Sequence, residues 1–196
     1  TFNFRGYRMT TIQPPSNCPS CDSWLEEVNN LFYCKNELCG EKLQKQIEHF
    51  AKTLKIKGLG PATIKKLKLE SINDLYWLTK NELKRLLDSS ILAGKLFNEI
   101  QNSRKAPLNV LLPAFSIPLI GKTAAEKLAK EFNDIEDIYY ERCRKAGLGE
   151  KAAKNLMDWM NIGFFDVAEL PFSWKFEKPQ ETTTHGVVCI SGKLTS

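Results

Sequence analysis

The stretch IKGLGPATI, residues 56–64, decides how this chain folds. Two glycines, Gly58 and Gly60, flank a single leucine, Leu59. Glycine adopts backbone conformations that other residues avoid, so the chain can reverse sharply here while leaving nearby N–H groups uncovered. Uncovered N–H groups at the start of a helix bind anions. The stretch therefore predicts two helices joined by a tight bend, with Leu59 in the core and a phosphate site at the start of the second helix.

Residues 52–68 around this bend are strongly basic, with six lysines and no Asp or Glu. We expect Lys57, Lys65 and Lys66 to add positive charge around the bound phosphate. Contacts of this kind engage the backbone of a nucleic acid and read no base, so binding should be independent of sequence and should weaken with salt. The alternative for a lysine run taken alone is a solvated helix face.

Similar phrases recur along the chain, which predicts a repeated unit. Gly60, Gly94, Gly121 and Gly149 are separated by 34, 27 and 28 residues, and a helix-forming stretch follows each of them. Repeats of this period indicate stacked supersecondary units. We therefore predict four helix-hairpin-helix motifs within residues 41–165.

The four predicted motifs keep different amounts of the pattern. Residues 146–151 repeat Gly-Leu-Gly, and residues 116–123 have Pro118 in place of the first glycine. Residues 91–95 keep one glycine, Gly94, and differ most from the pattern. A single Gly-x-Gly between helices is often an ordinary helix end, whereas four spaced copies favour DNA binding. We expect the bends to contact DNA in the order first, fourth, third, second. The expected contact residues are Lys57, Gly58, Gly60, Lys65, Gly121, Lys122, Thr123, Gly147, Gly149 and Lys151.

Four of the six cysteines lie close together in the sequence, as Cys18-x2-Cys21 and Cys34-x4-Cys39. Two cysteines on a tight turn can direct both sulfurs at one ion, and four sulfurs complete the tetrahedron that zinc prefers. The set predicts a structural zinc site in a small ribbon over residues 18–40. An iron–sulfur cluster or free thiols are the alternatives.

The bulk composition is that of a globular protein, with 42% hydrophobic and 26% charged residues among 196. The net charge of +5 is compatible with a polyanionic partner. No apolar run approaches the roughly 20 residues of a membrane helix, and the first residues lack the apolar core of a signal peptide. We expect a protein of the cytoplasm without a membrane partner.

The order of these motifs resembles the carboxy-terminal half of the NAD-dependent DNA ligases of bacteria and some viruses. The phrases that carry the resemblance are CKNELC at 34–39, HFA at 49–51, IKGLG at 56–60, DLYWLT at 74–79, residues 111–132 and VVCISGKL at 187–194. The expected fold is mainly α, with a four-cysteine zinc ribbon, tandem helix-hairpin-helix motifs and a terminal β segment. The remaining expected segments are an arm or OB-fold tail at 1–17, a linker at 166–186 and the first strand of an incomplete BRCT-like domain at 187–196.

The resemblance implies nick sealing in replication and repair, in which NAD adenylates an enzyme lysine. The family's Lys-x-Asp-Gly motif occurs nowhere in the chain. We therefore expect no catalytic or NAD-binding residue here, and expect the chain to be inactive alone and to need an adenylation and OB half. That half would be part of the same polypeptide or the other subunit of a split, phage-type ligase.

The sequence is also compatible with two functions outside the ligase family. The first is a non-enzymatic helix-hairpin-helix module of another repair protein, which would bind DNA without stimulating ligation. The second is a zinc-stabilised helical adaptor that binds protein, which would bind duplex DNA no better than any chain of charge +5.

Overall fold

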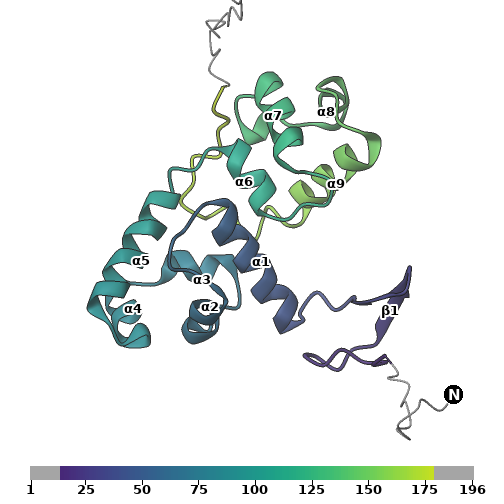
Figure 1. Cartoon of the computed structure of the whole chain (residues 1–196). Coiled ribbons are helices and arrows are strands. Elements are labelled where there is room, and N and C mark those ends of the chain that lie inside the picture. Colours follow the sequence, from purple (N-terminus) through teal and green to yellow (C-terminus); the bar gives the residue numbers. More distant parts are fainter. Residues whose placement is uncertain (1–13, 179–196) are drawn as a thin grey trace, which may run out of the picture.

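The computed structural model describes residues 14–178. Most of the expected arm at 1–17, the second part of the expected linker, and the expected strand at 187–196 lie outside the described residues. Within 14–178 the chain forms a small ribbon followed by a helical body, and the ribbon projects from the start of the first helix (Figure 1).

The ribbon consists of two short antiparallel strands, β1 (Leu25–Val28) and β2 (Leu31–Cys34). Asn29 and Asn30 form the turn between them, with φ angles of 53° and 61°. Asparagine tolerates this left-handed conformation, and two such residues in a row make the turn that suits the twist of a two-residue hairpin. The register pairs Leu25 with Cys34, which places one metal-ligand candidate at the open end of the hairpin.

Helices and the short connections between them make up residues 40–161, so the mainly α fold with a four-cysteine ribbon is confirmed. Ser71 and Thr79 are the N-caps of α3 and α4. Their hydroxyls accept the backbone N–H of Asp74 and Glu82, and the carboxylates of these two residues accept the N–H of the N-cap. The helices are α1 (Gly40–Thr53), α2 (Pro61–Leu67), α3 (Ile72–Trp77), α4 (Lys80–Leu87), α5 (Ser90–Ser103), α6 (Leu108–Ala114), α7 (Lys122–Glu131), the 3-10 turn η1 (Ile135–Asp137), α8 (Tyr140–Lys145) and α9 (Glu150–Asn161). None of these has both the length and the apolar character that a membrane span requires.

The helices pack as pairs, and the pairs form two similar halves. In the first half α1 packs on α2 and α4 on α5; in the second half α6 packs on α7 and α8 on α9. A short connecting element, α3 or η1, separates the two pairs of each half. The contact between α1 and α6 joins the halves, which lie one above the other in Figure 1.

Each pair turns through a bend that we number in chain order. The first bend is 54–60, the second 88–89, the third 115–121 and the fourth 146–149. The prediction for Gly94 was wrong, because this residue lies inside α5 and the bend before α5 consists of Asp88 and Ser89. The reversal there needs no glycine, since Asp88 itself takes the left-handed conformation at φ 53°.

The segment 167–176 is packed against the helices, although the sequence predicts a linker at 166–186. Val167, Leu170, Phe172 and Phe176 are buried. Backbone bonds tie the segment to the second half, from the N–H of Leu108 to the carbonyl of Lys175 and from the N–H of Phe176 to the carbonyl of Asn133. Because irregular backbone loses its water when buried, these bonds replace the lost partners.

The same segment also reaches the first half through aromatic packing. The Phe172 ring lies with its centroid 5.2 Å from that of Tyr76 and 6.4 Å from that of Phe50. Such tilted and edge-on ring pairs stabilise a core beyond their buried area. The segment therefore holds the two halves together and is part of the helical body.

Candidate nucleic-acid interface and metal centre

The four clustered cysteines come together in space, as their spacing predicts. Their sulfurs all lie within 4.8 Å of one another, with 3.8 Å between Cys18 and Cys39 and 3.5 Å between Cys21 and Cys34. Two sulfurs come from the turn before β1, one from the end of β2 and one from the residue before α1. The group could hold a metal ion, and four sulfurs around one point suit a tetrahedral ion.

The surroundings of the sulfurs favour thiolates at some positions. The Ser23 hydroxyl, 3.4 Å away, lowers the pKa of Cys21 to about 6. The backbone N–H of Lys42 in the first turn of α1 lowers the pKa of Cys39, as expected for a thiol at a helix N-terminus. Desolvation by burial raises the pKa of Cys34 to about 12. Thiolates are the metal-binding form of cysteine, so the shifts at Cys21 and Cys39 favour a bound cation, whereas Cys34 would have to lose its proton to bind one.

The first bend has the geometry expected of a phosphate site. Gly58 adopts φ +86°, in the left-handed region, while Leu59 is buried beneath the bend. Gly60 is the N-cap of α2, and no side chain caps the helix there. The first N–H groups of a helix have no partner within it, so this end of α2 offers donors at the surface.

The third and fourth bends repeat this arrangement. Gly121 and Gly149 are the N-caps of α7 and α9, again without a side-chain cap. Gly147 takes φ +88° and corresponds to Gly58. In the third bend this left-handed place belongs to Leu119, with φ 67°, whereas Pro118 corresponds to Lys57. The assignment of Pro118 to the glycine position was therefore off by one residue, because Leu119 and not Pro118 stands two residues before Gly121, as Gly58 stands two residues before Gly60.

At the second bend a side chain of the protein itself caps the N-terminus of the following helix. Ser89 is the N-cap of α5, and its hydroxyl accepts the N–H of Leu92. A serine cap of this kind uses a donor that the other three bends leave available. The second bend, which is last in the expected order of DNA contact, is thus the least suited to bind an anion through its backbone, and the reason is a serine cap that lies outside the glycine pattern.

The three N-cap glycines are not required by the fold of the protein itself. Their φ angles of −93°, −100° and −64° are open to any residue. A Cβ atom added at Gly60, Gly121 or Gly149 would meet no other atom within 4 Å. Since neither backbone strain nor packing demands glycine, the missing side chains leave room for a molecule outside the protein. The side chain of an N-cap residue lies next to the first N–H groups of its helix, so this space adjoins those groups.

Cross-bonds hold the bends of each half side by side. Lys66 on α2 donates to the Leu87 carbonyl at the second bend, and Lys127 on α7 donates to the Gly147 carbonyl at the fourth. In return the Lys57 N–H donates to Glu99 on α5, and Asn155 on α9 donates to the Pro118 carbonyl. Pro118 has no N–H that could donate as Lys57 does, so at the third bend the proline carbonyl accepts a bond instead. Lys66 thus braces the fold, unlike the phosphate contact expected of it.

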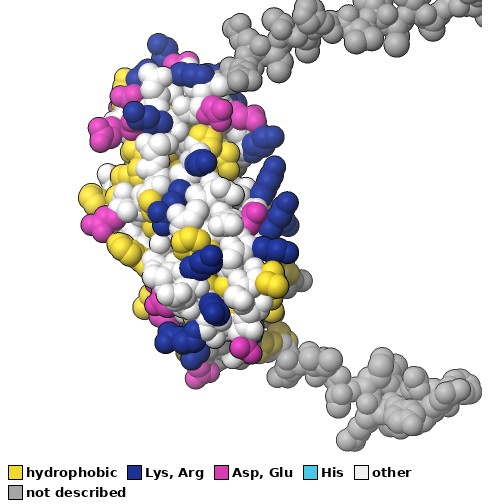
Figure 2. Space-filling view, turned by 90° about the vertical axis from the view of Figure 1, so that its left-hand side faces the viewer, with side chains coloured by type: hydrophobic (Ala, Val, Ile, Leu, Met, Phe, Trp, Pro, Cys, Tyr) yellow, Lys and Arg dark blue, Asp and Glu magenta, His cyan; other side chains and the backbone are white. Residues whose placement is uncertain are grey.

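The other predicted lysines lie on the surface near the bends. Lys57, Lys65, Lys122 and Lys151 are exposed, as are Gly58, Gly121, Thr123 and Gly149. Lys65 pairs with Glu41 at 3.6 Å and Lys122 with Glu126 at 3.8 Å. Exposed pairs of this kind contribute little to stability, so both ammonium groups are free to exchange partners. Figure 2 shows Lys and Arg side chains spread over the face that carries α4 and α5, with a row of them along its right-hand edge.

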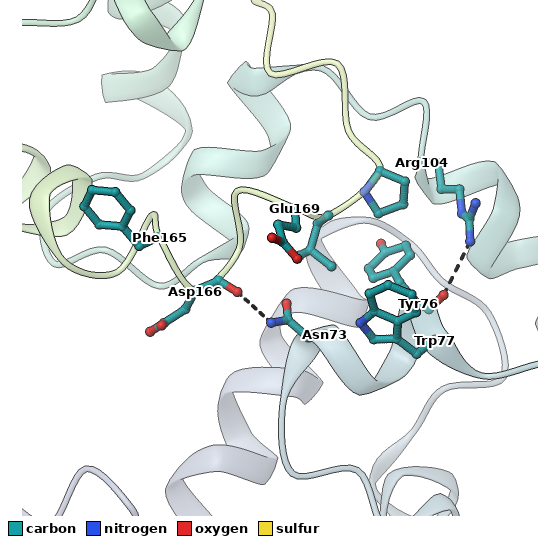
Figure 3. A pocket seen from close by; sticks show the side chains of 9 residues that line it. Asn73, Tyr76, Trp77, Arg104, Phe165, Asp166 and Glu169 are labelled. Atoms are coloured by element: carbon teal, nitrogen blue, oxygen red, sulfur yellow. Dashed lines mark hydrogen bonds between the residues drawn. The ribbon is translucent and has the colours of Figure 1, made fainter.

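A separate pocket of about 220 Å³ lies between α3, the end of α5 and residues 165–171 (Figure 3). Asn73 donates to the Asp166 carbonyl at 2.6 Å and Arg104 to the Tyr76 carbonyl at 3.4 Å. Both side chains keep one buried polar atom without a partner, Oδ1 of Asn73 and Nε of Arg104. None of the residues that line this pocket belongs to the four bends.

Gly58 offers a direct test of the bend geometry. Gly58→Ala is expected to lower the free energy of unfolding by about 1 kcal/mol, because left-handed backbone strains a residue with a Cβ by about 1–2 kcal/mol and the stiffer unfolded chain returns part of this cost. Urea denaturation measures the difference. Equal or greater stability of the alanine variant would contradict the left-handed conformation at this position.

Comparison with known proteins places the chain among ligases. DNA ligase 1 of Clostridium acetobutylicum is 33% identical over 160 residues, which cover 76% of this chain and 24% of that protein. A DNA ligase of Sulfurovum sp. is 34% identical over 168 residues, 81% of this chain and 26% of that protein. The chain corresponds to a DNA ligase C-terminal region. DNA ligase 2 of Clostridium acetobutylicum matches this ligase region more widely, with 29% identity over 93% of the chain and 30% of the relative.

The chain spans about a quarter of the length of the curated ligases it matches. No protein-family model matches it. The resemblance to a DNA ligase C-terminal region, first drawn from the order of the motifs, is confirmed. The ten expected DNA contacts of this ligase region and the domain boundaries stay predictions.

Proposed function

We propose that this chain is the DNA-binding part of an NAD-dependent DNA ligase and grips nicked duplex DNA for sealing in replication and repair. The observation that carries the proposal is the set of three helix N-termini, at Gly60, Gly121 and Gly149, that lack both a cap and a covering side chain. The names of the relatives support the ligase activity.

The bends would bind DNA through phosphates. Each N-terminus offers N–H donors, which in α2 begin at Ala62 because Pro61 has none, and the positive end of the helix dipole; together these favour a phosphate oxygen. The cross-bonds from Lys127 and Asn155 fix the third and fourth bends relative to each other. A rigid pair of donors can span neighbouring phosphates of the duplex without reading its bases.

The metal that we assign to the four cysteines is zinc, in a structural role. Sulfur ligands alone leave no open position for a water or substrate, which is the mark of a structural site. Zinc would hold the short hairpin and the start of α1 together through Cys18, Cys21, Cys34 and Cys39. The ribbon would then keep a defined position beside the duplex.

The chemistry of sealing belongs, in this proposal, to an adenylation and OB half that uses NAD. This half would be joined to the present region in one polypeptide or would act as a second subunit. No catalytic or NAD-binding residue is assigned to the present chain. Its contribution would be to hold both sides of the nick so that the reacting ends stay aligned, which lowers the entropic part of the barrier.

Adding the chain to a separate adenylation half tests this function. Sealing of a nicked duplex is expected to rise by roughly 100-fold, since phosphate contacts supply most of the sequence-independent affinity for DNA. Sealing no faster than with the adenylation half alone would overturn the ligase role. DNA binding without any stimulation would instead favour a non-enzymatic helix-hairpin-helix module.

A further inference from the structure

We propose that Leu119, at the tip of the third bend, enters the minor groove of the bound duplex as an apolar wedge and favours nicked over intact DNA. The inference rests on the proposed function, because it needs the bends to face DNA. It concerns a side chain that none of the expected phosphate contacts includes.

Leu119 is held in a conformation that is unfavourable for its residue type. Its φ is 67°, and its place in the bend is that of Gly58 and Gly147, where glycine takes the left-handed conformation without strain. The side chain is 65% exposed. A leucine here therefore gains little from burial in the protein and strains the backbone, so the folded chain alone gives no reason for it.

The bend beneath Leu119 is rigid. Ile117 and Ile120, on either side of the tip, are buried, and the Ile120 N–H donates to the Ile117 carbonyl at 3.0 Å. Asn155 of α9 fixes the Pro118 carbonyl at 2.9 Å. The leucine is thus presented outward by a fixed turn, and it loses little freedom when it meets a partner.

The partner is identified by what lies beside the leucine. Two residues later Gly121 begins α7 with open space over its N–H groups, and Lys122 and Thr123 are exposed next to it. The Cα atoms of Leu119 and Gly121 are at most about 7 Å apart along the chain, so Leu119 would lie beside a phosphate bound at that helix end. The minor groove is about 6 Å wide, so the leucine reaches the groove that borders the bound phosphate.

An aliphatic side chain in the minor groove acts by parting stacked bases. Proteins that kink DNA insert residues such as leucine between base steps, and the cost is the loss of stacking. This cost is least where the duplex is already damaged. A nick interrupts one strand, so a leucine that enters at the nick loses less stacking energy than one that enters intact duplex. The leucine therefore raises the preference of the protein for nicked DNA.

Leu119→Gly tests the wedge without removing the fold, because glycine suits the left-handed place. The variant is expected to bind nicked duplex five- to tenfold more weakly and intact duplex of the same sequence less than twofold more weakly. The slope of affinity against salt concentration should not change, since no charge is lost. Leu119→Asn, which tolerates the same backbone conformation, should behave alike if loss of the apolar group is the cause.

Lys122→Gln is the matched control. It is expected to weaken binding to both duplexes equally and to reduce the salt slope by about one. If both Leu119 variants keep the full preference for nicked DNA, the wedge is refuted while phosphate binding stands. If the unaltered chain binds neither duplex, the proposed function fails and the wedge fails with it.

Discussion

Replacing Gly60 and Gly149 together by serine is expected to weaken binding to nicked duplex DNA by about 100-fold while leaving the protein as stable or slightly more stable. Serine at an N-cap places its own hydroxyl on the helix N–H groups, as Ser89 does at the start of α5. Two donor sites would then be occupied from within, and each lost hydrogen bond to a charged phosphate is worth about 1.5–3 kcal/mol.

The fold tolerates this double change because nothing in the protein occupies the added volume. A Cβ at either position meets open space, and serine caps a helix slightly better than glycine. Stability and affinity should therefore move independently, which separates a lost contact from a damaged fold. Fluorescence anisotropy with labelled nicked duplex and urea denaturation measure the two quantities.

Gly94→Ala is the control for this experiment. Gly94 lies inside α5, where an added Cβ would make ordinary contact with Lys80 at 3.9 Å. Alanine there is expected to stabilise the helix by about 0.5–1 kcal/mol and to leave DNA affinity unchanged. If the double serine variant binds DNA within a factor of two of the unaltered chain, the helix ends at the first and fourth bends do not hold phosphates.

Removal of the zinc that we propose for the four cysteines is expected to unfold the ribbon and to leave the helical body folded. The hairpin has almost no core of its own, since Leu31 is 58% exposed and Tyr33 46%. An isolated two-stranded hairpin is at best marginally stable in water, whereas structural zinc contributes about 10–16 kcal/mol of binding free energy. The helices instead share a continuous core with residues such as Phe50, Leu111 and Leu128.

Chelation followed by two spectroscopic measurements checks this expectation. The amide signals of residues 18–39 should collapse to unfolded positions, and the helical circular dichroism should fall only slightly. Cys18→Ser should give the same result with zinc bound weakly or not at all. A ribbon that keeps its native amide signals after complete metal removal would show that the four sulfurs do not depend on an ion.

Cys143 offers a matched control for the cysteine variant. Its thiol is fully buried in the core on α8, and burial raises its pKa to about 11. Cys143→Ala should cost stability by leaving a small cavity, about 1 kcal/mol, without altering the amount of zinc per chain. Loss of zinc in this variant would mean that metal binding depends on the whole helical body.

Local signals carried the predictions that the structure confirms. The cysteine spacing brought four sulfurs within 4.8 Å of one another, because two cysteines on one turn converge by backbone geometry alone. Apolar periodicity and glycine positions likewise sufficed for the mainly helical fold. The segment 167–176 was missed because Pro171 and the polar residues that follow the segment in the sequence suggest a linker, while its burial depends on distant aromatic residues such as Tyr76.

By itself the sequence determined the four-cysteine site, the helices and the Gly-x-Gly bends at Gly58 and Gly147, since each depends on residues close together in the chain. Only the tertiary structure decided that Ser89 and not Gly94 marks the second bend, that Leu119 takes the left-handed place in the third, and that Lys66 turns to the Leu87 carbonyl. These features depend on backbone angles and on partners from other helices. Packing sets both, and the spacing of the glycines gives the position of Leu119 but not its conformation.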